Sequence, residues 1–297
     1  MPNKKRPVAN RISLLLLAVL VLLCLLDIFT GFFLKNITNL HKILIYCVIF
    51  ILPMFIYMKT GKYKTREMIK TGFIKIKHLP FVLLFGISVS VICAVINAAS
   101  IAVFSGLFDM QISTSTVSFA SENPFVIGLT AVFLPALCEE ALIRGIAMSE
   151  YEKYGLPIAV VLTSLVFALF HGSLVSFVSL LVAGICYAVL TCLFKSIWPA
   201  VICHCINNAL AVFMNESSDK VGYLMQDSIF VIIFCVLVFA VLYFTLLLAE
   251  GVVNDLGDKN RFKTNRKNMV YGEPLGSVYI WIFFAVSIFN MVRNVII

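Results

Sequence analysis

The stretch FLPALCEEALIRGIAM, residues 133–148, places two adjacent carboxylates, Glu139 and Glu140, and the guanidinium of Arg144 inside an otherwise apolar segment. A charged side chain at the centre of a bilayer costs at least about 2.5–3.5 kcal/mol, so each one needs an ion-pair or hydrogen-bond partner or a functional role. The whole chain is 61% hydrophobic and only 13% charged, whereas soluble domains carry about 25% charged residues. The composition therefore predicts an all-α integral membrane protein without a soluble domain.

About nine apolar runs approach the length of a transmembrane helix, which needs about 20 residues. The runs are 12–34, 43–58, 81–105, 125–149, 156–172, 175–194, 197–214, 228–249 and 277–296. We expect a polytopic helical bundle with a four-helix core at 125–214. The N-terminal helices would occupy 1–124, and the C-terminal helices, with a polar cytoplasmic loop, 215–297.

Lysine and arginine residues gather in alternate loops of this predicted bundle. They precede the first and last runs, fill the segment between the second and third, and follow the fourth and sixth. The positive-inside rule therefore places the N-terminus in the cytoplasm. The segment near 59–80 mixes Phe73 and Ile76 with lysines and predicts an amphipathic helix on the inner leaflet, a solvated basic linker being the alternative. No basic patch lies on a soluble unit, which excludes nucleic acid as a partner.

The charged residues of the fourth run divide into a pair and a single carboxylate. Glu140 and Arg144 are four residues apart and face the same side of a helix, so they can pair. Glu139 lies about 100° around the helix and has no local partner. It is therefore a candidate general base. The structural alternative is a buried ion pair that only fixes helix packing.

Two further apolar runs carry histidines. His171 ends the sequence FALFHG, and His204 stands four residues before Asn208 in WPAVICHCINN. His204 and Asn208 share one helix face, from which both side chains can donate hydrogen bonds to one oxygen. Hydrogen bonds between packed helices are the alternative for each residue taken alone. An acid, two imidazoles and an amide that converge in a bundle would suit the addition of water to a carbonyl.

The order E-E-x-x-x-R, F-x-x-x-H, H-x-x-x-N resembles the CAAX-protease and bacteriocin-processing family, also called CPBP or Abi, of intramembrane proteases. The matching residues are Glu139, Glu140, Arg144, Phe167, His171, His204 and Asn208. The resemblance covers about 125–214 and implies a CAAX prenyl protease-like intramembrane endopeptidase. It implies that Glu139, helped by His171, activates water. His204 and Asn208 would then hold the oxyanion, and Glu140 and Arg144 would orient Glu139.

The resemblance leaves the use of a metal open, because the family is described both as metalloproteases and as glutamate-dependent enzymes. Glu139, His171 and His204 could hold zinc with one position open for water. The same side chains could also work without metal, as a Glu-activated water with a His/Asn oxyanion hole. We prefer the metal-free mechanism, because Asn208 is a poor zinc ligand and a good hydrogen-bond donor.

The expected substrate is a hydrophobic or membrane-anchored peptide in a bacterial plasma membrane, and the expected role is peptide maturation or bacteriocin self-immunity. A non-catalytic membrane partner or immunity protein that keeps the motif for helix packing is the alternative. A proton-carrying transporter would predict repeat symmetry, which the sequence does not show. Helix rise places His204 about 13 Å from the loop at Lys195 and His171 about 24 Å from the loop at Gly155. The two histidines can therefore meet only if the run 156–172 is tilted or starts outside the hydrocarbon layer.

Overall fold

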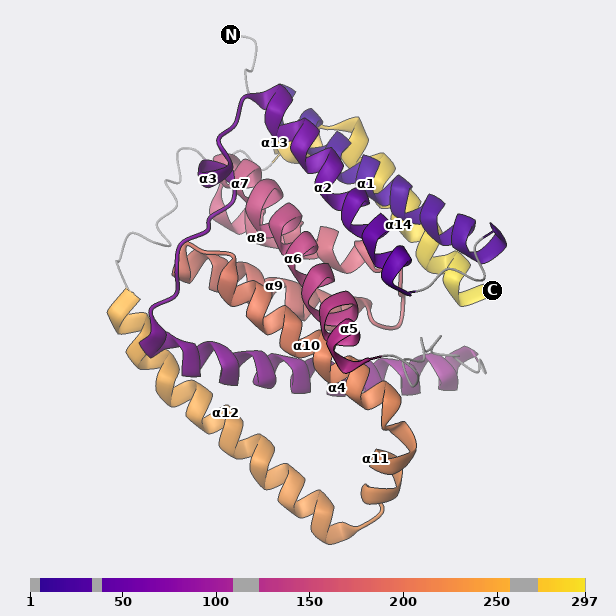
Figure 1. The fold of residues 1–297 in the computed structure, drawn as a ribbon, viewed down its shortest axis with the longest axis vertical. Helices are drawn as coiled ribbons and strands as arrows, with labels where there is room; N and C mark the ends of the chain where they lie inside the picture. The colour runs from indigo at the N-terminus through magenta and orange to yellow at the C-terminus, as the bar shows by residue number, and fades with distance from the viewer. Residues whose placement is uncertain (1–5, 34–38, 109–122, 257–271, 297) are drawn as a thin grey trace.

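The computed structural model describes residues 6–33, 39–108, 123–256 and 272–296 (Figure 1). Within these ranges the chain is almost entirely helical, and its only extended pairing is an isolated bridge between Thr71 and Ser196. The predicted all-α class and the helical membrane bundle are thereby confirmed.

Helical segments follow the predicted apolar runs in order. They are α1 (Arg6–Phe33), α2 (Asn39–Gly61), α4 (Leu79–Phe108), a composite helix over 124–151, α8 (Leu156–Phe170), α9 (Phe177–Phe194), α10 (Trp198–Glu216), α12 (Ser228–Leu256) and α14 (Val278–Ile296). The short helices are α3 (Thr65–Met68), α11 (Ser218–Leu224) and α13 (Gly272–Leu275). Among the described residues, seven helices are long and apolar enough to cross a membrane, and α8 is a shorter apolar helix. The count of nine spans thus remains a prediction.

The composite helix changes its winding twice. It consists of α5 (Pro124–Ile127), a π-helical stretch (Gly128–Phe133), α6 (Leu134–Glu140), a second π-helical stretch (Ala141–Ala147) and α7 (Met148–Tyr151). Pro135 lies at the start of α6, where it has no N–H to donate, and the wider turn before it accommodates that missing bond. Both glutamates of α6 are buried, Glu140 completely.

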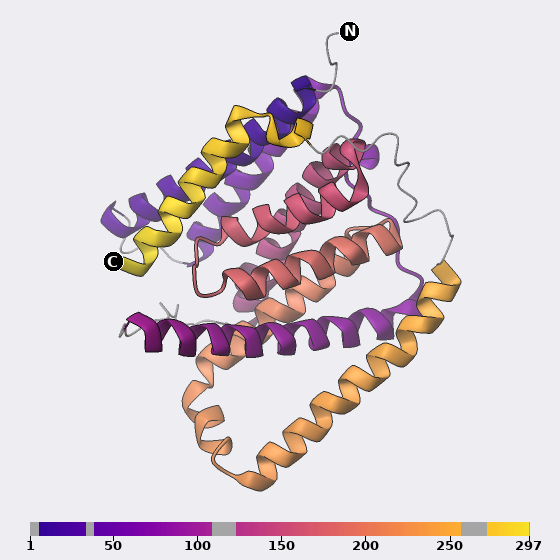
Figure 2. The same cartoon turned by 180° about the vertical axis from the view of Figure 1, so that it is seen from behind.

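The helices form three layers. Helices α1, α2 and α14 lie together on one side, α4 and α12 lie on the other, and the composite helix with α8, α9 and α10 fills the space between them (Figures 1 and 2). Within the middle layer, α9 packs against both α8 and α10, and α10 also packs on α4 of the outer layer. Helix α12 packs mainly on α4 and leaves most of its apolar surface outward, as expected of a lipid-facing helix.

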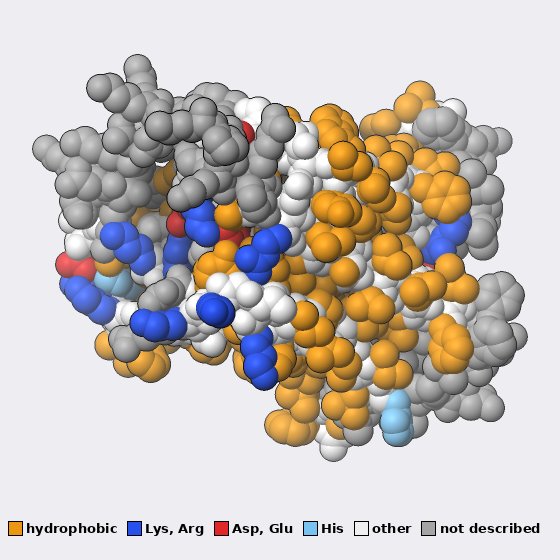
Figure 3. Space-filling view, turned by 90° about the horizontal axis from the view of Figure 1, so that it is seen from above, with side chains coloured by type: hydrophobic (Ala, Val, Ile, Leu, Met, Phe, Trp, Pro, Cys, Tyr) orange, Lys and Arg blue, Asp and Glu red, His pale blue; other side chains and the backbone are white. Residues whose placement is uncertain are grey.

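Charged and apolar surface are separated along the bundle. In the view of Figure 3, most visible lysine and arginine side chains gather on one side, and hydrophobic side chains cover the other. Seven of the exposed lysines are found at the end of α2, in the segment that follows it, and after α7 and α9; they are Lys59, Lys62, Lys64, Lys75, Lys77, Lys153 and Lys195. We call this the lysine end of the bundle.

The segment near 59–80 does not form the single amphipathic helix predicted from its sequence. Helix α2 continues to Gly61, α3 is one turn, and a 3₁₀ turn covers Ile76–His78. The intervening chain is tied to the start of α10, since the N–H of Ile197 donates to the carbonyl of Lys70 at 2.8 Å. This bond and the bridge between Thr71 and Ser196 take the place of the backbone hydrogen bonds of a helix. Phe73 is nevertheless 98% exposed among lysines, which suits a membrane interface.

Candidate active site

Glu139, His171 and His204 meet although they come from three helices. One possible ligand atom of each side chain lies within 4.8 Å of those of the other two. His171 directly follows the last residue of α8, and Tyr154, just before the first residue of this helix, is fully buried. The structure thus brings the predicted acid and both imidazoles together.

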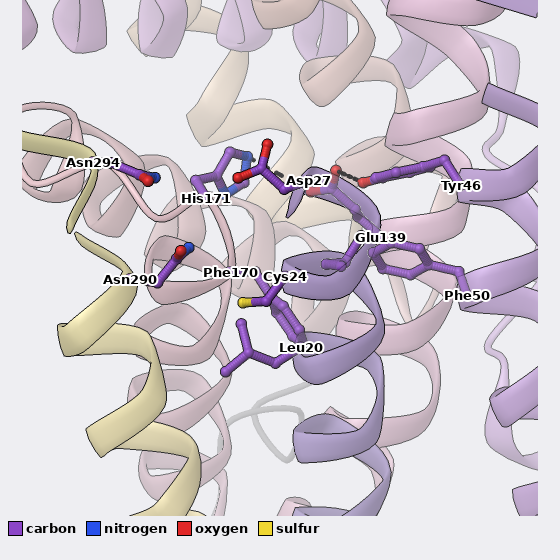
Figure 4. A pocket seen from close by; sticks show the side chains of 11 residues that line it. Leu20, Cys24, Asp27, Tyr46, Phe50, Glu139, Phe170, His171, Asn290 and Asn294 are labelled. Atoms are coloured by element: carbon purple, nitrogen blue, oxygen red, sulfur yellow. Dashed lines mark hydrogen bonds and ion pairs between the residues drawn. The ribbon is translucent and has the colours of Figure 1, made fainter. Parts of the chain in front are cut away.

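Glu139 receives a hydrogen bond that the sequence did not predict. The hydroxyl of Tyr46, in α2, donates to Glu139 Oε1 at 2.5 Å (Figure 4). The second oxygen, Oε2, is buried without a hydrogen-bond partner among the described residues and lies 3.7 Å from Nε2 of His171. A separation of this size, too long for a direct hydrogen bond, is one that a water molecule can bridge. Glu139 therefore has one oxygen fixed and one facing the site.

The spacing F-x-x-x-H has a direct structural reason. Nδ1 of His171 lies 2.8 Å from the carbonyl oxygen of Phe167, one turn earlier in α8. Because a carbonyl only accepts hydrogen bonds, Nδ1 carries the proton. In the neutral ring, Nε2 then directs its lone pair toward Glu139.

A buried network around Glu140 holds His204. Nδ1 of His204 lies 3.0 Å from Glu140 Oε1, and Nε of Arg144 lies 3.2 Å from Glu140 Oε2, as the four-residue spacing predicted. Arg144 also donates to the carbonyl of Gly184 at 2.9 Å, and its guanidinium lies 4.5 Å from the ring centre of Phe167. Glu140 and Arg144 are completely buried. The network joins the composite helix to α8, α9 and α10 and leaves the second nitrogen of His204 available.

Asn208 does not point at the same oxygen as His204. Its amide Nδ2 lies 3.5 Å from the carbonyl of Val132, in the first π-helical stretch, whereas His204 is bonded to Glu140. The two residues share a helix face, as predicted, but they have no common acceptor in this conformation.

A cavity of about 280 Å³ opens beside Glu139 and His171 (Figure 4). It is lined by α1, α2 and α14 as well as by the site itself, and its residues are Leu20, Leu23, Cys24, Asp27, Tyr46, Phe50, Glu139, Phe170, His171, Asn290 and Asn294. Asp27 has a partner, because Arg293 Nη2 donates to its Oδ2 at 2.7 Å. The cavity is thus lined by both apolar and polar side chains.

Residues 121–210 match the family model described as Rce1-like, type II CAAX prenyl endopeptidase Rce1-like. The chain carries an Rce1-like core. This core contains Glu139, His171, His204 and the Glu140 network, so the predicted family is confirmed. The match identifies an intramembrane protease. Comparisons with curated proteins and with solved structures found no match.

The donor set of the Rce1-like core fits a zinc ion. Zinc sites in enzymes commonly use three protein ligands and keep a position open for water. Glu139, His171 and His204 supply such a set. Each histidine has its Nδ1 held by an oxygen, from the Phe167 carbonyl or the Glu140 carboxylate, which is how zinc-binding imidazoles are usually oriented.

Gly172 brings α14 close to the site. Its φ is +58°, and a Cβ at this position would lie 2.5 Å from the amide nitrogen of Asn290. We expect Gly172→Ala to lower the free energy of unfolding by at least about 1–2 kcal/mol, the usual cost of a left-handed conformation for a residue with a side chain. Thermal unfolding in detergent measures the change. The control, Gly251→Ala in α12, has nothing within 4 Å of the new Cβ and should not destabilise the protein. Equal stability of both variants would contradict the prediction.

Proposed function

We propose that this intramembrane protease is an endopeptidase that cleaves a membrane-associated peptide with a water molecule activated by Glu139. The observation that carries the proposal is Oε2 of Glu139, which accepts no hydrogen bond from the residues that the structure describes and lies 3.7 Å from His171 Nε2 at the wall of the cavity. Residues 125–214 are the catalytic core in this proposal. Helices that precede and follow them in the sequence complete the cavity.

The geometry supports a specific position for the water. One hydrogen would be donated to Glu139 Oε2 and the other to His171 Nε2, which leaves an oxygen lone pair for the substrate carbonyl carbon. Glu139 accepts the proton as the new C–O bond forms and then delivers it to the amide nitrogen as the C–N bond breaks. Tyr46 fixes the plane of the carboxylate throughout, because it binds the other oxygen.

We further propose that His204 and Asn208 stabilise the oxyanion. His204 would donate from the nitrogen that Glu140 does not hold, in its doubly protonated form, with the Glu140 carboxylate supporting the charge. Asn208 would turn from the Val132 carbonyl when substrate binds, since catalytic hydrogen bonds often form fully only in the complex. Arg144 acts through Glu140 as a positioning residue.

The same three side chains would hold zinc if the ion takes part. Bound zinc would make its water a stronger nucleophile and polarise the substrate carbonyl. In that case Glu139, His171 and His204 are ligands, and Glu140 and the Phe167 carbonyl orient the two imidazoles. Tyr46 then selects the Glu139 oxygen that faces the site.

The test of the proposed function is the fate of membrane peptides in cells that produce the wild-type chain or its Glu139→Gln variant. Mass spectrometry of membranes and medium should find new peptide ends only with the wild type. A non-catalytic membrane partner that uses the motif for packing predicts identical peptides from both. In the cell, we propose a multi-pass protein of a bacterial plasma membrane with a cytoplasmic N-terminus, acting in peptide maturation or bacteriocin self-immunity.

Removing the hydroxyl of Tyr46 tests its contribution to catalysis. Tyr46→Phe should lower the cleavage rate by about 10–100-fold, because a hydrogen bond to a charged group contributes about 1.5–3 kcal/mol. Single-turnover cleavage of a peptide identified in the comparison above measures the rate. Tyr57→Phe, in the same helix but not bonded to Glu139, is the matched control and should cleave at the wild-type rate. A Tyr46→Phe rate equal to that of the control would remove Tyr46 from the mechanism.

A further inference from the structure

The amide of Asn290 reaches the candidate active site from outside the catalytic core. Asn290 lies in α14, within the candidate membrane span Val278–Val295, and lines the same cavity as Glu139 and His171 (Figure 4). Among the residues that the structure describes, its half-buried side chain has no hydrogen-bond partner. A polar side chain in a membrane helix is costly unless it is paired or has a functional role. The position of this amide in the cavity therefore indicates a ligand.

The turn after α8 holds the Asn290 amide close to the site. Gly172 directly follows His171, and a Cβ at Gly172 would lie 2.5 Å from Nδ2 of Asn290, so the glycine leaves the space that this amide occupies. One turn later in α14, Nδ2 of Asn294 donates to the carbonyl of Gly172 at 3.0 Å. Asn294 is thus used to fix α14 against this turn, whereas Asn290 stays available beside His171.

A peptide that is cleaved inside a membrane needs partners for its backbone. In an α-helix the N–H and C=O groups bond to one another, but a segment that opens for attack by water loses these bonds, and unpaired groups are costly in apolar surroundings. The carboxamide of asparagine carries one acceptor oxygen and two N–H donors. It can therefore bond both backbone groups of one extended residue, as the hydrogen-bonded pairs of an antiparallel sheet do.

We propose that Asn290 binds the substrate backbone in an extended conformation close to the scissile bond. The inference rests on the proposed function and adds a substrate-binding residue outside the matched residues 121–210. Oδ1 of Asn290 accepts from the N–H of one substrate residue, and Nδ2 donates to the C=O of the same residue. An extended chain advances about 3.3 Å per residue, so this residue lies about one to three positions from the scissile bond. The contact selects an unwound backbone and not a particular side chain.

Replacing Asn290 by leucine, which has nearly the same shape, tests the contact in the full-length chain. The substrate is a synthetic copy of a membrane peptide whose new end depends on Glu139. In proteoliposomes, Asn290→Leu should raise KM by about 5–30-fold, the effect of losing one or two backbone hydrogen bonds, and should change kcat little. Asn254→Leu, at an exposed position of α12 outside the cavity, is the matched control and should keep the wild-type KM.

Ester analogues of the substrate separate a direct contact from a change in fold. An ester in place of one non-scissile amide removes a single backbone N–H donor. At one position within about three residues of the scissile bond, the wild type should bind the ester about 5-fold less well, whereas Asn290→Leu should not distinguish ester from amide. Equal discrimination by both proteins, or an unchanged KM for folded Asn290→Leu, would overturn the proposal.

Two further measurements keep these outcomes distinct. Thermal unfolding reports the fold of each variant, and Asn290→Ser repeats the comparison if the leucine variant fails to accumulate. If Glu139→Gln abolishes cleavage while Asn290→Leu keeps the wild-type KM, the proposed function stands and Asn290 does not bind the substrate. If no new peptide end depends on Glu139, the proposed function fails, and this inference fails with it.

Discussion

Replacing Glu139 by glutamine should reduce peptide cleavage by about 10²–10⁴-fold, the usual contribution of a general base. Glutamine has the same shape and keeps a carbonyl oxygen that can accept the Tyr46 hydrogen bond, so the fold should be retained. What is lost is the basic oxygen opposite His171 Nε2, now 3.7 Å away. If zinc is bound, the change removes an anionic ligand and also abolishes cleavage. Single-turnover cleavage in proteoliposomes measures the loss.

The matched control for this variant is Glu152→Gln. Glu152 follows α7, is bonded to Lys70 near the lysine end and lies outside the cavity. It should retain wild-type cleavage, while Glu139→Gln should match the wild type in thermal unfolding. If folded Glu139→Gln cleaves at the control rate, Glu139 is not the base and the proposed function fails. If both variants lose activity, a change in fold rather than in chemistry explains the result.

Much of the fold could be predicted because its signals are local. Apolar runs of membrane length give helices wherever they occur, and the four-residue spacings of Glu140 with Arg144 and of Phe167 with His171 correspond to contacts along one helix. The convergence of Glu139 with two imidazoles could also be predicted, because polar side chains that are costly to bury in a membrane usually have a functional role. These features depend on the helical spacing of residues and on the apolar environment of the membrane, and both can be recognised in the sequence.

The remaining features depend on contacts between distant segments. Tyr46 and Glu139 are separated by 93 positions, and Asp27 and Arg293 by 266, so no periodicity connects them. The predicted amphipathic helix was lost to a backbone bond between Lys70 and Ile197, which competes with local helix formation. Asn208 turns to Val132, in a π-helical stretch that hydrophobic periodicity does not reveal. In each case a tertiary contact outweighs a local preference.

Arg144→Met should be the most destabilising substitution considered for the core, lowering the free energy of unfolding by about 3–5 kcal/mol. The reason is that it leaves the completely buried Glu140 carboxylate without its counter-charge, 3.2 Å from the lost Nε. The matched control is Arg293→Met. Its partner Asp27 has a side chain that is 66% exposed to solvent and not buried like Glu140, so removal of this ion pair should cost about 0–1 kcal/mol. Denaturant unfolding in detergent micelles measures both changes.

A double variant separates the lost charge from lost packing. Glu140→Gln combined with Arg144→Met removes both charges of the buried ion pair and should recover most of the stability. Cleavage should remain impaired, because a neutral amide supports a cationic His204 less well than the Glu140 carboxylate 3.0 Å away. If the double variant is as unstable as Arg144→Met alone, the stacking of the guanidinium on Phe167, at 4.5 Å, and its bond to Gly184 account for the effect. In that outcome Arg144 stabilises the helix packing directly rather than through Glu140.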